Sequence, residues 1–466
     1  MNDSGFGIAG HHGTAIIVSM VVAYIAFTAW LTARSRSKTA SEFMVGARSL
    51  PAVVVGVLMV SEFIGAKSTI GTAQAAFESG MAASWAVLSA AIGFPLFGLV
   101  LARKLYNTGE YTISGAIFQR YGRSTQMVVS LIMIYALLLV NVGNYISGAA
   151  AIATVLHISL PLAAFVIAVV STFYFAFGGM KSLAYVTLWH SVIKYLGVLV
   201  VLYVALALTG GIAPMAAALP AFYFTWDGAI GAPTIVAFFI GNIGAIFSTQ
   251  YIIQAISSTR SANAARRATY IAGWLAVPIG IALGLIGVAA RYLYPHMDSL
   301  YALPMFLQSM NVYTAGFVTV SLVAAIFAGV STVALAIASL VVRDFYVPLC
   351  QPTPEREFRA TRWMALAIGL VPLVFVFFAP GLMHLSFFTR ALRLSISVVA
   401  VMGMYLPFFG SNRGATCGLL AATLTTTVWY LLGNPWGIDN MYIALVTPAI
   451  VILAERVFGR GGGVKQ

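Results

Sequence analysis

The chain has 466 residues, of which 61% are hydrophobic and only 8% are charged, and its mean hydropathy is +0.95. These values are typical of a polytopic membrane protein and exclude a soluble globular protein. The formal net charge of +13 would suit a nucleic-acid partner, but the distribution of the charges along the chain decides that question.

Apolar runs long enough to span a membrane, about 20 residues each, recur along the whole chain. The short alternating segments of a membrane β-barrel are missing. The sequence therefore predicts an all-α membrane protein with about thirteen transmembrane helices. Their expected spans are 14–33, 50–79, 81–101, 125–156, 160–177, 183–208, 234–257, 268–290, 314–342, 363–379, 387–409, 415–432 and 439–455.

Basic residues gather in the linkers that follow odd-numbered predicted helices. Twenty of the 25 lysines and arginines lie there, from Arg34 after the first helix to Lys465 after the last, whereas Arg291 is alone on the other side. The positive-inside rule then places the amino terminus outside and the carboxyl terminus in the cytoplasm. The charge reflects topology, so we expect a multi-pass protein of the inner (plasma) membrane, surrounded by lipid and without a nucleic-acid partner.

The linkers between the predicted helices are short. No hydrophilic stretch exceeds roughly 25 residues, which leaves no room for a soluble catalytic domain. We find no nucleophile, histidine and acid set, and the two cysteines and six histidines show no metal-site spacing. The sequence predicts one membrane domain over residues 1–466 that is not an enzyme and holds no metal or cofactor.

The second and seventh predicted helices share an unusual feature, because each combines glycines with polar residues. The second helix carries Gly65 and Gly71, and the seventh carries Gly241 and Gly244. Interrupted segments at corresponding positions of two halves indicate an inverted-repeat transporter with a site near the membrane midplane. The expected repeats are residues 50–208 and 234–409, with an extra helix at 14–33 and two more at 415–455. Close helix packing is the alternative role of these glycines.

The stretch "SEFIGAKSTIG", residues 61–71, places Glu62 and Lys67 inside an expected membrane helix. A charge at the membrane centre costs about 2.5–3.5 kcal/mol on insertion scales and so indicates function. Five residues apart on an intact helix, the two side chains would point about 140° apart, so a charge pair requires a break in the helix.

Several motifs together resemble the sodium:solute symporter family over residues 14–410. They are "TIGTAQAAFESGMAASW" (69–85), "TGEYTISGAIFQRYG" (108–122), "FAFGGMKSLAYVTLWHSVIK" (175–194), "GNIGAIFSTQYIIQAISSTRSANAARRA" (241–268) and "AAIFAGVSTVALAIASLVVRDFY" (324–346). The resemblance implies a LeuT-like fold with two five-helix inverted repeats. It also implies cation-driven uptake of a small solute by alternating access.

The resemblance also implies a sodium site, and this chain departs from it. The implied backbone carbonyls belong to Ser61, Ile64 and Ala325, but the two hydroxyl positions carry Ala328 and Gly329, and the position of a supporting acid carries Thr187. Sodium is a hard cation that requires several oxygen ligands. We therefore expect a remnant of a cation site, with Lys67 supplying the positive charge and H⁺ as the coupling ion, or transport without sodium.

Two other roles for Lys67 stay open, namely contact with a carboxylate substrate and a structural pair with Glu62. Arg390 and Arg393 are expected near the outer end of their helix, as a cationic approach for an anion or as residues that snorkel to the interface. His190 and Lys194, one turn apart, form a weaker candidate for a proton relay. The residues expected to bind substrate are Lys67, Ser68, Thr69, Asn141, Asn144, Tyr145, Asn242, Ser248, Gln250 and Arg390.

The sequence thus predicts a secondary transporter that imports a small organic solute, preferably a carboxylate such as a monocarboxylate. The alternative within this class is a Na⁺-coupled symporter of an amino acid or another solute, with Ser331 and Thr332 as substitute ligands. A membrane sensor module is the remote alternative. The solute, the stoichiometry and the oligomeric state are left open by the sequence.

Overall fold

The computed structural model describes residues 11–458 except 38, 157, 176–177, 379–381 and 407–410. Some side chains within helices also lie outside this description, among them those of Glu62 and Lys67. The α-helices are α1 (His11–Arg34), α2 (Ala40–Val45), α3 (Ala52–Phe63), α4 (Ala66–Ser79), α5 (Trp85–Val100), α6 (Ala102–Asn107), α7 (Ile113–Tyr121), α8 (Arg123–Leu156), α9 (Leu160–Phe175), α10 (Gly179–Thr209), α11 (Ile212–Ala218), α12 (Gly231–Ser248), α13 (Gln250–Ser257), α14 (Ala262–Leu293), α15 (Val312–Val341), α16 (Val347–Cys350), α17 (Pro354–Leu370), α18 (Leu382–Tyr405), α19 (Asn412–Leu431) and α20 (Asn440–Phe458).

Short helical turns of other types join these helices. They are 3₁₀ turns at Gly46–Arg48, Met81–Ser84, Ala221–Phe224, Ser299–Tyr301, Pro304–Ser309, Val371–Phe378 and Pro435–Gly437, and a π-turn at Val342–Tyr346. Polar side chains in the linkers cap several helix starts. Thr112 accepts a hydrogen bond from the Gly115 amide at the start of α7, and Ser261 accepts one from the Ala264 amide at the start of α14. These caps satisfy backbone amide groups in the first turns of the two helices.

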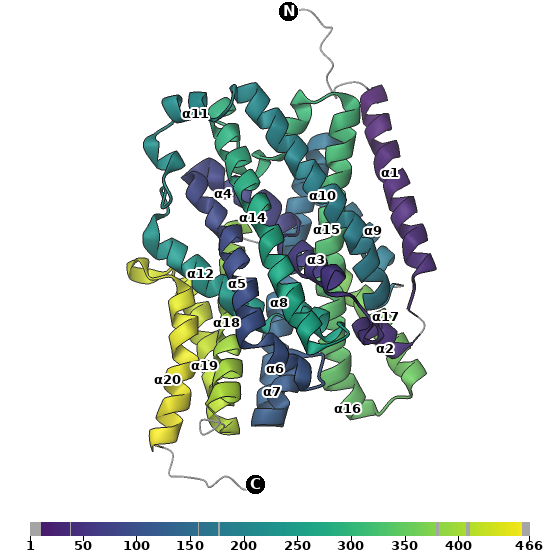
Figure 1. The fold of residues 1–466 in the computed structure, drawn as a ribbon, viewed down its shortest axis with the longest axis vertical. Helices are drawn as coiled ribbons and strands as arrows, with labels where there is room; N and C mark the ends of the chain where they lie inside the picture. Colours follow the sequence, from purple (N-terminus) through teal and green to yellow (C-terminus); the bar gives the residue numbers. More distant parts are fainter. Residues whose placement is uncertain are drawn as a thin grey trace, which may run out of the picture.

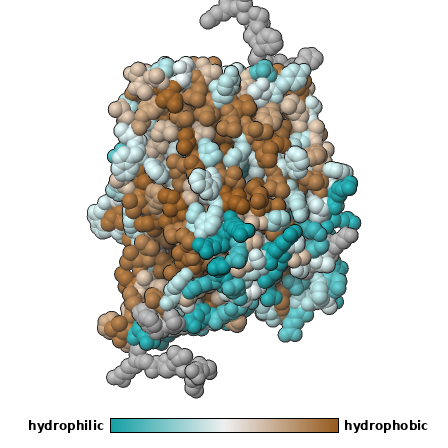
Figure 2. All heavy atoms as spheres, viewed as in Figure 1, coloured by the Kyte–Doolittle hydropathy of each residue, from teal (hydrophilic) through white to brown (hydrophobic). Residues whose placement is uncertain are grey.

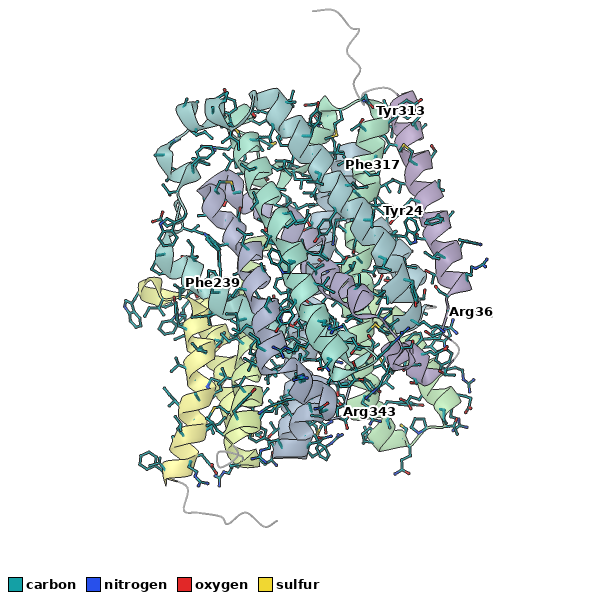
Figure 3. All side chains as sticks on the ribbon, in the orientation of Figure 1. Tyr24, Arg36, Phe239, Tyr313, Phe317 and Arg343 are labelled. Carbon is teal, nitrogen blue, oxygen red and sulfur yellow. The ribbon has the colours of Figure 1, made fainter. Side chains whose placement is uncertain are left out.

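Most helices run roughly along one direction, so that the bundle has two ends (Figure 1). Arg36 and Arg343 lie toward the end where α20 finishes, and Tyr313 lies at the opposite end (Figure 3). Figure 2 shows hydrophilic residues gathered at the lower right of this face, whereas a broad hydrophobic surface covers its upper part and its lower left. Two arginines of the predicted cytoplasmic linkers therefore lie toward the same end, while the topology as a whole stays a prediction.

Nine helices in the described part of the chain are long and apolar enough to cross a membrane. Two shorter apolar helices lie at Ala52–Ser61 and Leu160–Val169. The expectation of an all-α membrane protein is confirmed, whereas the number of thirteen crossings stays a prediction. One expected span, 363–379, begins as α17 and continues after Leu370 as the 3₁₀ turn Val371–Phe378, which contains a proline.

Helix α15 lies at the centre of the bundle and packs against α1, α8, α10 and α17. Every residue of its apolar membrane window is buried. A helix that is apolar on all sides is typical of such a central position. Helices α3, α4, α12 and α13, by contrast, form two interrupted pairs, and these breaks position the candidate site.

Candidate functional site

The first interruption lies between α3 and α4. Helix α3 ends at Phe63, α4 begins at Ala66, and Ile64 between them has non-helical dihedral angles (φ −102°, ψ 58°). The Ser68 hydroxyl donates to the Phe63 carbonyl at 2.8 Å, and the Thr69 hydroxyl donates to the Gly65 carbonyl at 2.9 Å. Short polar side chains thus satisfy part of the freed backbone, as an interrupted membrane helix requires. The predicted break at "SEFIGAKSTIG" is confirmed.

Two further carbonyls of this break accept hydrogen bonds from a buried ammonium group of α10. The Nζ atom of Lys194 donates to the Ser61 carbonyl at 3.1 Å, to the Ser61 hydroxyl at 3.1 Å and to the Ile64 carbonyl at 2.9 Å. The side chain is only 2% exposed. An ammonium group has three N–H donors, and these three oxygens match them. The partial negative charge at the carboxyl end of α3 adds to the attraction.

We expected Lys67 to reach this place, but its side chain and that of Glu62 lie outside the described residues. Lys194, for which we predicted a proton relay with His190, makes the contacts described above. The Nδ1 atom of His190 lies 2.5 Å from the Tyr24 hydroxyl of α1. One signal would have pointed to Lys194: it follows Thr187 by seven residues, or two helical turns, and therefore shares its face of α10.

The second interruption lies between α12 and α13 at Thr249, which has extended dihedral angles (φ −61°, ψ 126°). Arg393 of α18 donates from Nη1 to the Thr249 hydroxyl at 2.9 Å, and the Ser248 hydroxyl donates to the Arg393 carbonyl at 2.7 Å. The break therefore lies five residues after Gly244, away from the two glycines that suggested it.

Gly241 and Gly244 lie inside α12, where they permit close packing. A Cβ atom at position 244 would lie 2.3 Å from a side-chain carbon of Leu394, and one at position 241 would lie 2.0 Å from the sulfur of Met441. These distances leave no room for a side chain. The alternative role that we considered for the pair, close packing, is the one observed.

Arg390 and Arg393 are buried in the bundle, with side chains 5% and 3% exposed. This burial excludes snorkelling to the membrane interface. The guanidinium carbon of Arg390 lies 5.7 Å from the ring centre of Phe63, the last residue of α3. Two arginines one turn apart on α18 thus contact both interruptions: Arg390 the first and Arg393 the second.

The other residues expected at a substrate site do not all face one space. The Asn141 amide is 3.5 Å from the Val330 carbonyl of α15, and Asn144 donates to Asn141 at 3.2 Å. Tyr145 points away from both, because its hydroxyl bonds to the Gly369 carbonyl of α17. The asparagines therefore lie close to the central helix, whereas Tyr145 is buried and joins α8 to α17.

The polar residues expected around the seventh predicted helix also separate. Asn242 donates to the Ala86 carbonyl of α5 at 2.9 Å. The side chain of Gln250 bonds to the Ile113 amide and the Tyr111 carbonyl, each at 3.0 Å, and so anchors the start of α7. Ser248 stays beside Arg393. These contacts assign Asn242 and Gln250 to joints between helices.

The positions implied for a sodium site on α15 and α10 are all buried. Ala325, Ala328 and Gly329 lie on α15, and the Thr332 hydroxyl bonds to the Ala328 carbonyl at 2.9 Å. The hydroxyls of Thr187 and Ser331 have no hydrogen-bond partner among the described residues. Within that part of the chain, no cluster of three His, Cys, Asp or Glu side chains is placed to hold a metal ion.

The comparison with protein families decides the assignment, because residues 43–422 match the sodium:solute symporter family. The chain belongs to the sodium:solute symporter family. The uncharacterized symporter YwcA of Bacillus subtilis is 22% identical to it, over 94% of this chain and 91% of that protein. The high-affinity proline transporter PutP of the same organism is 22% identical, over 85% and 88%.

The fold of this symporter is similar to solved transporter structures. A Na⁺-coupled sialic acid symporter in a substrate-bound outward-open state matches with a TM-score of 0.82 at 16% identity, over 96% of this chain and 98% of that chain. At this identity the likeness shows the fold, which is the LeuT-like fold expected from the motifs. The protein is thus a multi-pass membrane transporter of a small solute, and its relatives are transporters rather than enzymes.

Proposed function

We propose that this symporter imports a small organic carboxylate by alternating access, with the solute bound between the two helix interruptions and α18. The observation that carries the proposal is the buried guanidinium group of Arg390, 5.7 Å from the Phe63 ring at the end of α3. Arginine presents a planar pair of donors that matches a carboxylate, and such charge-assisted hydrogen bonds are strong in a water-poor site.

The amino end of α4 supports the same solute class. Helix α4 begins at Ala66, in the interior of the bundle, directly after the break. Amide groups in the first turn of a helix lack intrahelical partners and carry partial positive charge, which favours anions. Lys67 lies in this first turn and stays a candidate contact for the carboxylate, together with Ser68 and Thr69.

A thermal-unfolding screen of the purified protein tests the solute class. Pyruvate and lactate should stabilise the protein, whereas pyruvamide, which has the same shape without the charge, should not. Arg390→Lys keeps the charge but loses the paired donors, so we expect the half-saturating pyruvate concentration to rise by about 10-fold, or about 1.4 kcal/mol. Arg291→Lys, at a residue that contacts the Pro295 carbonyl near the end of α14, is the matched control.

An amino acid is the second candidate solute, because the proline transporter PutP is similar over most of the chain. Its carboxylate would use the same arginine, and its amino group would need an acceptor nearby. Stabilisation by proline without stabilisation by pyruvate would contradict the carboxylate proposal. A response to glucose alone would contradict both.

A further inference from the structure

The ammonium group of Lys194 stands where a coupling cation would have to bind. Its Nζ atom lies 2.9 Å from the Ile64 carbonyl and 3.1 Å from the Ser61 carbonyl, the two α3 oxygens implied for a sodium ion by the family resemblance. The Ser61 hydroxyl, a third oxygen at the same place, is 3.1 Å from Nζ. A sodium ion could use these oxygens only if the lysine left them.

The rest of the implied sodium site does not fit the ion either. The two hydroxyl positions on α15 are Ala328 and Gly329, which have no side-chain oxygen, and Gly329 packs so closely that an added Cβ would lie 3.1 Å from the Asn144 amide nitrogen. The acid position is Thr187. Sodium, a hard cation, requires several oxygens and gains from a nearby negative charge, so this donor set is too small.

The same features suit a cation that is attached to the protein. An ammonium group needs three acceptors, and the end of α3 provides three. A second positive charge within about 3 Å would be repelled strongly in this buried place, since Coulomb repulsion grows as distance and dielectric constant fall. The lack of hydroxyls and an acid at the implied positions, and the presence of the Lys194 ammonium, therefore agree with each other chemically.

We propose that the Lys194 ammonium is a resident cation that replaces the sodium ion at the interrupted helix, so that this protein does not bind sodium between α3 and α10. The lysine connects the end of α3 to α10 in the way that a bound ion would connect its ligands. The positive charge that a sodium ion would bring to this site is thereby supplied by a side chain of the protein.

The first test measures sodium binding without any solute, which keeps it independent of the proposed carboxylate. Purified wild-type protein is unfolded thermally in equal concentrations of sodium, potassium or choline chloride. We expect the same unfolding temperature in all three salts. Stabilisation by sodium alone would overturn the proposal, whatever the transported solute is. A failure of pyruvate to bind would affect only the proposed solute class.

The second test measures the role of the charge in proteoliposomes with pyruvate as the probe. Wild-type uptake should be the same with sodium or potassium outside. Lys194→Met keeps the length and removes the charge, so uptake should fall by about 10-fold or more, because two buried carbonyls lose a charged donor. Lys194→Arg keeps a cation and should retain a measurable part of the uptake.

Lys181→Met is the matched control, because it removes a lysine from the same helix at its half-exposed pair with Glu42. It should transport like the wild type. Uptake by Lys194→Met at the wild-type rate would overturn the proposal. Should Lys194→Met fail to yield a monodisperse protein, the comparison of Lys194→Arg with wild type and the salt series on wild type still decide the question.

Discussion

The two helix interruptions have the same arrangement of helices but are stabilised by different contacts. Each receives a buried cationic side chain from the last helix of its own predicted five-helix set: Lys194 of α10 at the first, Arg393 of α18 at the second. At the first, the cation bonds to two backbone carbonyls at the end of α3. At the second, it bonds to the hydroxyl of Thr249 and to the Thr389 carbonyl of its own helix.

The contacts around the two interruptions also differ, because the second interruption is packed more closely against its neighbouring helix. Helix α12 is joined to α18 by close packing of Gly244 on Leu394 and by hydrogen bonds from Ser248 and Ser397. At the end of α3, the Phe63 carbonyl accepts from the Ser68 hydroxyl. The Ser61 and Ile64 carbonyls accept from the Lys194 ammonium group. We infer that the first interruption is an ion site whose ion is a lysine, and that the second is a packed joint.

The two interruptions should differ most in how much uptake falls when the cationic side chain is removed from each. Lys194→Met should lower uptake by about 10-fold or more, whereas Arg393→Met should lower it less than about 5-fold, because Arg393 bonds across the break to a hydroxyl, that of Thr249, rather than to two backbone carbonyls. Initial uptake rates in proteoliposomes measure both. Equal losses would mean that the two interruptions have the same role.

Gly244→Ala tests the packed joint. The added Cβ would lie 2.3 Å from Leu394, so we expect the free energy of unfolding to fall by about 1–3 kcal/mol. Thermal unfolding in detergent measures the change. Combined with Leu394→Ala, which makes room, the glycine substitution should cost less than it does alone. Additive losses would argue against direct contact between the two side chains.

Thr249→Val removes the hydroxyl that Arg393 contacts and keeps the shape of the side chain. We expect a loss of about 1 kcal/mol in the free energy of unfolding, since interhelical hydrogen bonds in membranes contribute about that much. Thr319→Val is the control, because the Thr319 hydroxyl bonds only to the Ala315 carbonyl of its own helix among the described residues. A larger loss in the control would contradict the role of Thr249.

The smallest effect is expected for Lys181→Met. Its ion pair with Glu42 measures 3.1 Å, but the lysine side chain is 39% exposed. Solvent screens such a pair, so we expect a change of less than about 0.5 kcal/mol in the free energy of unfolding. A larger change would mean that lysines on α10 contribute to stability in general, and Lys181→Met would then not serve as a control for Lys194→Met.

The sequence was sufficient for the fold and for the first interruption. Long apolar runs predicted the membrane helices, and glycine next to polar residues at 61–69 predicted the break, because these are local properties of the chain. The second break was misplaced. It depends on Arg393, which is 144 residues from Thr249 along the chain, whereas the nearby glycines serve packing.

Lys194 shows the same limit. It meets Ile64 across 130 residues of sequence, so the spacing within either segment could not reveal the contact. What the sequence did show was the loss of ligands at Ala328, Gly329 and Thr187 and the need for a positive charge. The burial of Arg390 was equally hidden, because its position near the start of a helix resembles that of an interfacial residue.

A cation that enters from one side of a membrane and leaves on the other carries charge through the electric field. Each such charge is driven by about 2.3 kcal/mol per 100 mV. The ammonium of Lys194 stays attached to α10 and completes no such crossing. Work for accumulating the solute must then come from another ion or from a second solute moving outward. The direction of transport then follows the combined gradients of the solute and of the ion or second solute that moves with it.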